Sequence, residues 1–301
     1  MTKNQTLIDR RQFNIAAAAA ASTFALPLRA TASPTDRYKL CAFIKFLQAL
    51  DYEELSEKIA EAGFDGVEPT CRHKDGYIDP KRATDELPRF NEALKKRNLE
   101  ISILTTDVLR ADEPHVESML RTAAGLGIKR YRLGFYRYDL KRPILRQLAE
   151  LQPVVRDIAA MNRELNIAAV YQNHAGADFM GATIWDLHSL IKEFPVEQIG
   201  CVFDIRHAAV EGGEAWPAYL NLMTPHLGAV SVKDYRWDGA KSQHVPLGDG
   251  RVSPRFFQLL RKTDFRGPIS LHVEYLPKAD AQANLKALVR DAAKLREWLD
   301  T

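Results

Sequence analysis

Lys39–Phe43 is a short β-rich apolar run, and the four residues that follow it, Ile44-Lys45-Phe46-Leu47, contain no glycine. An open, doubly wound α/β sheet normally carries a glycine-rich phosphate loop directly after its first strand. The sequence has no such loop here, so the doubly wound fold is disfavoured. For a chain that alternates strands with helices, the remaining common arrangement is a closed (β/α)8 barrel.

Eight β-rich runs alternate with amphipathic helical stretches from Tyr38 onward, a pattern typical of parallel βα units. Several helical stretches end in glycine, which is a common helix stop. No linker or low-complexity tract interrupts them, so we predict an α/β fold, a single-domain TIM barrel over residues 33–301. The predicted strands are Lys39–Phe43, Asp65–Pro69, Glu100–Thr106, Lys129–Gly134, Ile167–Gln172, Gly200–Asp204, Ala229–Asp234 and Pro268–Tyr275, and the predicted helices include Tyr52–Ala62, Glu113–Leu126, Pro143–Leu165 and a closing Ala279–Leu299.

The first 32 residues have the features of an export signal. Arg10 and Arg11, with Phe13 shortly after them, precede a mildly apolar run, and Ala30-Thr31-Ala32 supplies a small-x-small cleavage site. The arginine pair resembles a twin-arginine signal, which serves proteins that cross the membrane already folded. The apolar run is shorter than the roughly 20 residues that a membrane anchor needs. We therefore expect a periplasmic or secreted protein without a membrane anchor.

Cleavage of this signal would change the charge balance. The whole chain has a formal charge of +3. The signal accounts for that excess, because it holds Lys3, Arg10, Arg11 and Arg29 against Asp9. The remaining chain is then close to neutral, which gives no support for a nucleic-acid partner. Its length is near the roughly 250 residues typical of one TIM barrel.

Three cysteines, Cys41, Cys71 and Cys201, occur in no metal-binding or redox spacing. We expect them to be small buried hydrophobic residues. Cys41 and Cys71 fall on adjacent predicted strands, and the sequence leaves open whether they pair.

Inward and outward positions can be assigned on the predicted strands. Barrel strands alternate side chains between the helices and the barrel interior. In the run 229–233, Val230 and Val232 must face the helices, so Ser231 and Lys233 point inward. The same rule turns several polar residues inward near the carboxyl ends of five strands, the face on which barrel enzymes place their chemistry. These residues are Glu68, Gln172, His174, Asp204, Ser231, Lys233, His272 and Glu274.

The same strand ends carry a family resemblance. Gly63-Phe64-Asp65-Gly66-Val67-Glu68 resembles a second-strand motif, and Phe203-Asp204-Ile205-Arg206-His207 resembles an Asp-x-x-His element. Val232-Lys233-Asp234, Pro246-Leu247-Gly248-Asp249-Gly250 and His272-Val273-Glu274-Tyr275 follow in the matching order. Together they resemble the xylose-isomerase-like superfamily of sugar isomerases and epimerases, to which the endonuclease IV family is related.

That resemblance implies a divalent metal ion, Mn, Mg, Co or Zn, held by Glu, Asp, His and Glu from strands five to eight. This sequence departs from the set twice, with Gln172 in place of the first Glu and Ser231 in place of the His. An amide oxygen coordinates a metal without charge, and Ser is a poor ligand. We therefore expect Asp204, Glu274 and Gln172 as metal ligands, with His174 or His207 completing the shell.

The resemblance also implies acid–base chemistry on a sugar. Epimerases of the family use two Glu carboxylates on opposite faces of the substrate, and Gln172 cannot take a proton. One-base chemistry remains: aldose–ketose isomerisation, or proton abstraction followed by β-elimination. The expected base is Glu274 or His207, and Lys233 or the metal would stabilise the enolate oxygen.

The expected substrate contacts are Glu68, His174, His244 and Trp237. His244 lies just before the glycine-rich loop, and an indole plane such as that of Trp237 stacks well on a sugar ring. An exported enzyme meets few sugar phosphates, and no phosphate cradle is visible in the sequence. We therefore expect a small unphosphorylated sugar or keto sugar as substrate.

The sequence leaves three alternatives open, the first of them within the same class of sugar enzymes. One is a lyase acting on 3-keto-glycosides, and another is a carbohydrate-binding barrel that has lost catalysis with the two ligand replacements. The third is an endonuclease, which would need an Asp-x-His before the glycine-rich loop, where this chain has Ser242-Gln243-His244. With Ser231 also in place of a His and no net positive charge, the endonuclease is the weakest of the three.

Overall fold

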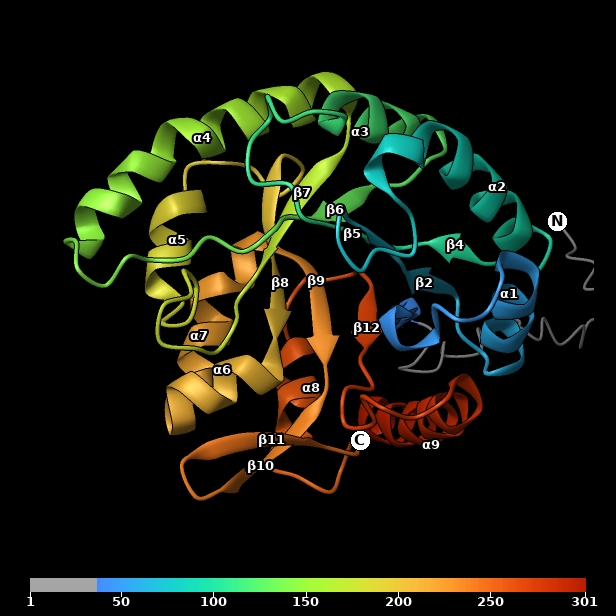
Figure 1. Ribbon diagram of the computed structural model, residues 1–301. Coiled ribbons are helices and arrows are strands. Elements are labelled where there is room, and N and C mark those ends of the chain that lie inside the picture. Colours follow the sequence, from blue (N-terminus) through green and yellow to red (C-terminus); the bar gives the residue numbers. More distant parts are fainter. Residues whose placement is uncertain (1–36) are drawn as a thin grey trace, which may run out of the picture. The chain divides into compact units, whose positions relative to one another are not determined.

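The computed structural model describes residues 37–301, and the export signal expected over residues 1–32 lies outside the described residues. The main sheet is parallel and curls around on itself (Figure 1). Its strands β2 and β3 are two halves of one strand, as are β4 and β5, so the predicted strand positions are confirmed. The strands are β1 Leu40–Phe43, β2 Gly66–Glu68, β3 Thr70–Cys71, β4 Glu100–Ile101, β5 Leu104–Thr106, β6 Arg130–Arg132, β7 Ala168–Gln172, β8 Ile199–Asp204, β9 Leu227–Val232 and β12 Ile269–Leu271.

The sheet closes into a barrel at its two interrupted strands. β2 pairs with β1 and β4, whereas β3 pairs with β5, which in turn pairs with β6. Pro69 separates β2 from β3 because proline has no N–H to donate to the ladder. Its carbonyl still accepts a 2.8 Å hydrogen bond from Thr105 N, so the pairing continues across the break. The two interrupted strands therefore join the two ends of the strand order, and the sheet closes on itself.

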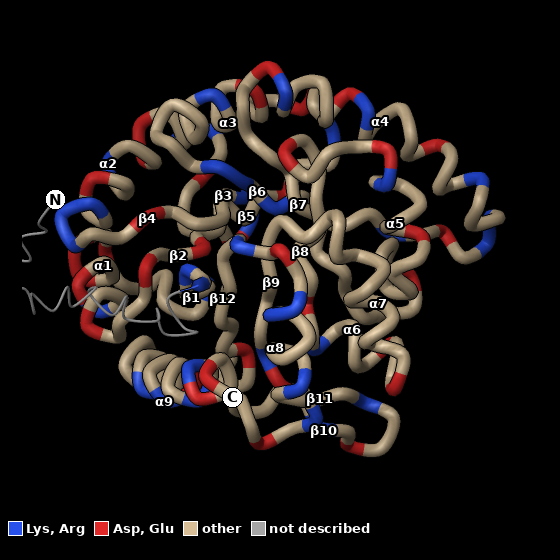
Figure 2. Tube along the Cα trace, turned by 180° about the vertical axis from the view of Figure 1, so that it is seen from behind, with Lys and Arg blue, Asp and Glu red and all other residues tan. Residues whose placement is uncertain are grey.

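Helices follow the strands along the chain and lie outside the sheet (Figure 1). The expected helices at residues 52–62, 113–126, 143–165 and 279–299 are confirmed to within a few residues. Gly63 ends the first of them with φ +74°, a conformation that favours glycine. Figure 2 shows both charge signs interspersed along the outer helices. The helices are α1 Tyr52–Glu61, α2 Ala83–Lys95, α3 Val116–Gly125, α4 Ile144–Leu165, α5 Trp185–Ile191, α6 Ile205–Gly212, α7 Trp216–Met223, α8 Arg255–Leu260 and α9 Ala281–Asp300.

An antiparallel hairpin, β10 Asp234–Asp238 and β11 Lys241–Val245, was not predicted from the sequence. Its strands are largely exposed, so they lack the apolar alternation that marks a half-buried strand. Gly239 turns the chain with φ +58°. The hairpin matters for function because it carries His244 back to the mouth of the barrel.

The predicted alternation of side chains is confirmed in the barrel interior. Cys41, Ile103, Val170, Val202 and Ala229, from five strands, form a small fully buried apolar cluster separate from the main core. Their outward neighbours pack with the helices in the large core. These fully buried apolar side chains fill the barrel interior below the polar residues at the strand ends.

All three cysteines are free and buried. Cys41 belongs to the interior cluster, whereas Cys71 faces the helical side with its Sγ 3.3 Å from Sδ of Met119. Adjacent strands therefore carry these two thiols on opposite faces, and they do not pair. In the part of the chain that the structure describes, no helix is long and apolar enough to cross a membrane.

Candidate active site

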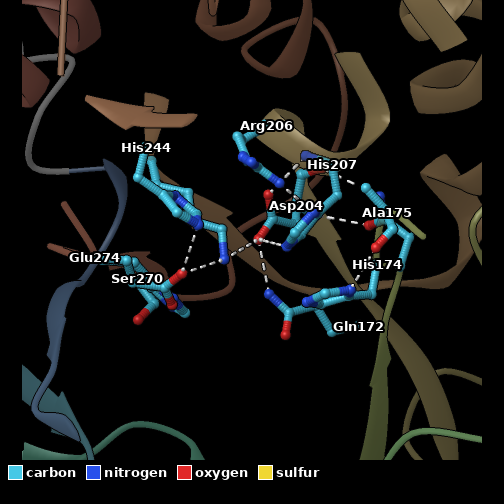
Figure 3. Close-up of polar contacts among 12 residues, drawn as sticks. Gln172, His174, Ala175, Asp204, Arg206, His207, His244, Ser270 and Glu274 are labelled. Carbon is cyan, nitrogen blue, oxygen red and sulfur yellow. Dashed lines mark hydrogen bonds and ion pairs between the residues drawn. The ribbon is translucent and has the colours of Figure 1, made fainter. Parts of the chain in front are cut away.

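Polar side chains gather where the carboxyl ends of β7, β8, β9 and β12 meet. Gln172 and Asp204 are the last residues of β7 and β8, Lys233 directly follows β9, and Glu274 comes shortly after β12. Because parallel strands end on the same rim of a barrel, these residues converge although they are far apart in sequence (Figure 3). Asp204 is also fixed as the N-cap of α6, where Oδ1 accepts a 3.1 Å hydrogen bond from His207 N.

Lys233 joins the two carboxylates of this cluster. Its Nζ lies 3.3 Å from Oδ2 of Asp204 and 3.3 Å from Oε2 of Glu274. Asp204 is fully buried, and the Lys233 side chain is only 5% exposed. A buried carboxylate without a cation would be strongly destabilising. The ammonium group therefore neutralises a negative charge that the fold has taken out of water.

Gln172 connects this cluster to an arginine. Its Nε2 donates a 2.7 Å hydrogen bond to Oδ2 of Asp204, and its Oε1 accepts from Nη1 of Arg132. A guanidinium only donates and a carboxylate only accepts, so these partners fix the orientation of the amide. An amide satisfies both neighbours at this position, whereas a glutamate would place a second negative charge against Asp204.

A second group of charged residues lies deeper in the barrel and surrounds Glu68. This fully buried carboxylate accepts from the hydroxyls of Thr105 and Ser270, and its Oε2 lies 3.2 Å from Nε2 of His272. Burial alone would raise the pKa of Glu68, but His272 and then Arg132 outweigh burial and lower it to about 2. Burial would likewise lower the pKa of His272, yet the negative Glu68 raises it.

Glu274 is the carboxylate nearest the opening. Burial would raise its pKa, but the charge of Lys233, followed by His272 and His244, holds the pKa well below the usual range. The ring nitrogens of both histidines lie 3.4 Å from its carboxylate oxygens. Glu274 is therefore ionised throughout the neutral range.

The three histidines at the rim are neutral at physiological pH. Burial, followed by the charge of Lys233, lowers the pKa of His174 to about 4 and that of His207 well below its usual value. Burial also lowers the pKa of His244 to about 4, helped by Arg206. His174 donates from Nδ1 to the Ala175 carbonyl at 2.9 Å, which leaves its Nε2 as an acceptor.

A cavity of about 640 Å³ opens above these residues at the barrel mouth. Its lining includes five of the predicted site residues: Gln172, His174, Lys233, His244 and Glu274. Three apolar rings, Phe43, Phe46 and Phe135, also line it. The cavity thus combines a small number of convergent polar groups with aromatic walls, as small-molecule sites generally do.

The remaining predicted site residues lie elsewhere. Glu68 and Asp204 are fully buried beneath the cavity and do not line it. His207 is 2% exposed, and its ring packs against that of His174 at a tilt of 35° with centroids 4.0 Å apart. It also does not line the cavity. Trp237 is on the exposed hairpin, where it packs edge-on against Tyr235. Glu68, His207 and Trp237 thus do not line the cavity in this arrangement, and their roles stay predictions.

Two cavity residues that the sequence prediction missed are Arg72, directly after β3, and Arg132, the last residue of β6. The alternation rule could have predicted that Arg132 points inward, because Tyr131 and Leu133 on either side of it pack outward in the main core. Arg72 carried no comparable signal, since it begins a loop.

The expected metal ligands do not form a metal site. Asp204 and Glu274 converge on one point as predicted, but that point is occupied by Nζ of Lys233. Gln172 gives its oxygen to Arg132 and turns its amide N–H toward Asp204. Nδ1 of His207 accepts from Arg206 at 3.0 Å. Across residues 37–301 no group of three His, Cys, Asp or Glu is arranged to hold a metal ion.

Comparisons with known proteins place this geometry in context. No curated protein sequence matches the chain. A family profile described as "Xylose isomerase-like TIM barrel" matches residues 56–298. Among solved structures, a D-psicose 3-epimerase has 16% identity and a TM-score of 0.65, covering 87% of this chain and 100% of its own.

Two further structures are similar to the same extent. The 3-keto-D-glucoside 4-epimerase of E. coli has 18% identity and a TM-score of 0.65, covering 87% of this chain and 99% of its own. A probable 3-DHS dehydratase of Bacillus anthracis has 14% identity and a TM-score of 0.65, covering 85% and 98%. At such low identity these likenesses establish the shared fold and nothing finer.

Proposed function

The chain belongs to the xylose isomerase-like TIM barrel family, and we propose that it abstracts a proton from the carbon next to a carbonyl group of an unphosphorylated sugar. The observation that carries this proposal is that Glu274 is the only carboxylate among the described residues that line the cavity. A general base must be ionised and within reach of the substrate. Glu274 is ionised, and it lines the cavity in which we place the substrate.

Lys233 supplies the second part of the chemistry. It lines the cavity beside Glu274, so a substrate carbonyl oxygen bound at Nζ would place its neighbouring carbon close to the base. The ammonium group would stabilise the negative charge that develops on this oxygen, the role usually given to a metal or an oxyanion hole. Sharing Lys233 with the substrate would also weaken its ion pair with Glu274 and so increase the basicity of the carboxylate.

The buried carboxylates do not act as a second base. Gln172 cannot take a proton, and Asp204 and Glu68 lie beneath the cavity. A single base favours aldose–ketose isomerisation or β-elimination over symmetrical epimerisation by two carboxylates. Isomerisation is our first proposal and elimination from a 3-keto-glycoside is the alternative, because both begin with the same proton abstraction.

The test follows C–H exchange in deuterium oxide by NMR across a panel of free aldoses, ketoses and 3-keto-glycosides. Glu274→Gln is expected to reduce the rate of exchange and of turnover by at least about 100-fold, the usual contribution of a general base. Glu117→Gln, which alters an exposed carboxylate on α3, is the control. Full activity of Glu274→Gln would refute the base, and rapid interconversion of epimers would refute the one-base account. Sugar binding without any exchange would favour a non-catalytic carbohydrate-binding barrel.

A further inference from the structure

Arg132 in the cavity wall has hydrogen-bonding capacity that the proton transfer does not use. Its side chain is 5% exposed, and its Nε is buried without a hydrogen-bond partner. Nη1 donates to Gln172 and lies 3.6 Å from Oε1 of Glu68. The guanidinium carbon lies 5.6 Å from the ring centroids of both Phe43 and Phe135. The aromatic rings thus hold this cation in place beside the cavity.

Arg72 lies in the same cavity lining, and its backbone is fixed by a tight loop. Its N–H donates to the Ile78 carbonyl at 3.1 Å. A Cβ at Gly76 would lie 2.4 Å from the Arg72 carbonyl oxygen, so only glycine fits there. The Arg72 side chain makes no ion pair with any described residue, and its Nε is buried without a hydrogen-bond partner. The fold therefore places an uncompensated guanidinium at the cavity.

The surrounding charges leave Arg72 without a counter-ion. Three carboxylates act on Arg72 from nearby, and each contacts another residue. Glu274 is engaged by Lys233, Glu68 is shared between His272 and Arg132, and Asp107 contacts His73. Burial, followed by the charge of Arg132, lowers the pKa of Arg72 to about 10, so both arginines remain cationic at neutral pH. Two neighbouring cations that repel each other favour a ligand anion near both of them.

We propose that Arg72 and Arg132 form a subsite for a carboxylate group of the substrate, which is therefore a sugar acid. This inference rests on the proposed function for the remainder of the substrate, whose carbonyl end would lie at Lys233 and Glu274. Arginine matches the planar geometry of a carboxylate with paired N–H donors. Lys45 also lines the cavity, so the number of cations does not by itself separate a carboxylate from a phosphate. We favour a carboxylate because the proposed substrate is an unphosphorylated sugar, and the test below includes a sugar phosphate.

The test is calorimetric titration of the purified protein with hexuronates and ketohexuronates. D-Glucose and D-galactose serve as uncharged counterparts, and D-glucose 6-phosphate serves as the phosphorylated one. At least one sugar acid should bind more tightly than every neutral sugar. Arg72→Gln should raise its Kd by about 10- to 100-fold, the usual effect of losing charge-assisted hydrogen bonds. Arg72→Lys keeps the charge but loses the paired donors, and its Kd should be intermediate.

Arg236→Gln is the matched control, because Arg236 is exposed on the hairpin and does not line the cavity. It should leave the Kd unchanged, and thermal melting should confirm that all variants are folded. Equal affinity for neutral and acidic sugars, or failure of every sugar acid to bind at millimolar concentration, would overturn the proposal. Tighter binding of the sugar phosphate that also depends on Arg72 would overturn it in favour of a phosphate subsite. Binding does not require the base, so sugar-acid binding without C–H exchange would refute the proposed reaction and leave the subsite intact.

Discussion

The ammonium nitrogen of Lys233 lies 3.3 Å from Oδ2 of Asp204, at the point where the strand-end carboxylates of this barrel converge. Relatives of this fold are expected to hold a divalent cation among such carboxylates. In this chain Lys233 supplies the positive charge. Gln172 adds a hydrogen bond from its neutral amide to the same carboxylate oxygen of Asp204. Gln172, one of the two departures from the family pattern, thus faces Asp204 together with a cation that the chain itself supplies.

We predict that turnover does not depend on a divalent metal. Dialysis against a chelator should leave the rate of C–H exchange unchanged, since Lys233 already occupies the point between the two carboxylates. Elemental analysis of the purified protein should find far less than one divalent ion per chain. One tightly held ion per chain whose removal abolishes turnover would contradict this expectation.

Gln172→Glu should destabilise the protein at neutral pH. The variant would replace an N–H donor 2.7 Å from Asp204 with a carboxylate, and two carboxylates at this distance share a proton. Protonation of the new carboxyl group would relieve this repulsion, so the loss of stability should be largest at neutral pH and shrink as the pH falls below about 4.3, the ordinary value for Glu. At pH 7 we expect a loss of about 1–3 kcal/mol in urea unfolding.

The chain provides a matched control for that variant. Gln243 donates from Nε2 to Asp238, but this pair is exposed on the hairpin. Because water screens exposed charges, Gln243→Glu should change the free energy of unfolding by less than about 1 kcal/mol. Equal effects of the two substitutions would show that burial of the Gln172 contact has no energetic importance.

Glu68→Gln should reveal the pH dependence of the deeper group of charged residues. The pKa of Glu68 is lowered to about 2 in the folded protein, so its ionisation stabilises the fold above the unfolded value, and this contribution is lost as the pH falls toward 2. The variant should be less stable than the wild type by about 3 kcal/mol at pH 7, with the difference shrinking below about pH 4.5. Denaturant unfolding at several pH values measures this difference, with Glu100→Gln in an exposed ion pair as control. A difference independent of pH would argue against the ion pairs.

Export is a separate prediction. A reporter fused after Ala32 should reach the far side of the membrane, and replacing Arg10 and Arg11 by lysine should retain it in the cytoplasm. A wild-type fusion that remains cytoplasmic would remove the localisation argument against phosphorylated substrates.

The sequence by itself determined the eight strand positions, their inward and outward faces, and the convergence of Asp204, Lys233 and Glu274 at one rim. These features follow from local periodicity, since a strand that must bury one face fixes the direction of every side chain along it. Only the tertiary structure decided which inward groups reach the cavity and which lie beneath it. Depth along the barrel axis depends on the stagger between strands, and periodicity within one strand carries no information about stagger.

The partners of each charge were likewise decided in three dimensions. The sequence suggested that Lys233 assists a reacting oxygen, and the structure places it against Asp204 and Glu274 together. Arg72 begins a loop, and its importance arises only because the fold brings Arg132 from a distant strand into the same cavity lining. Electrostatic pairing depends on distance in space. The sequence could therefore identify the charged residues but not which of them lie close enough to pair.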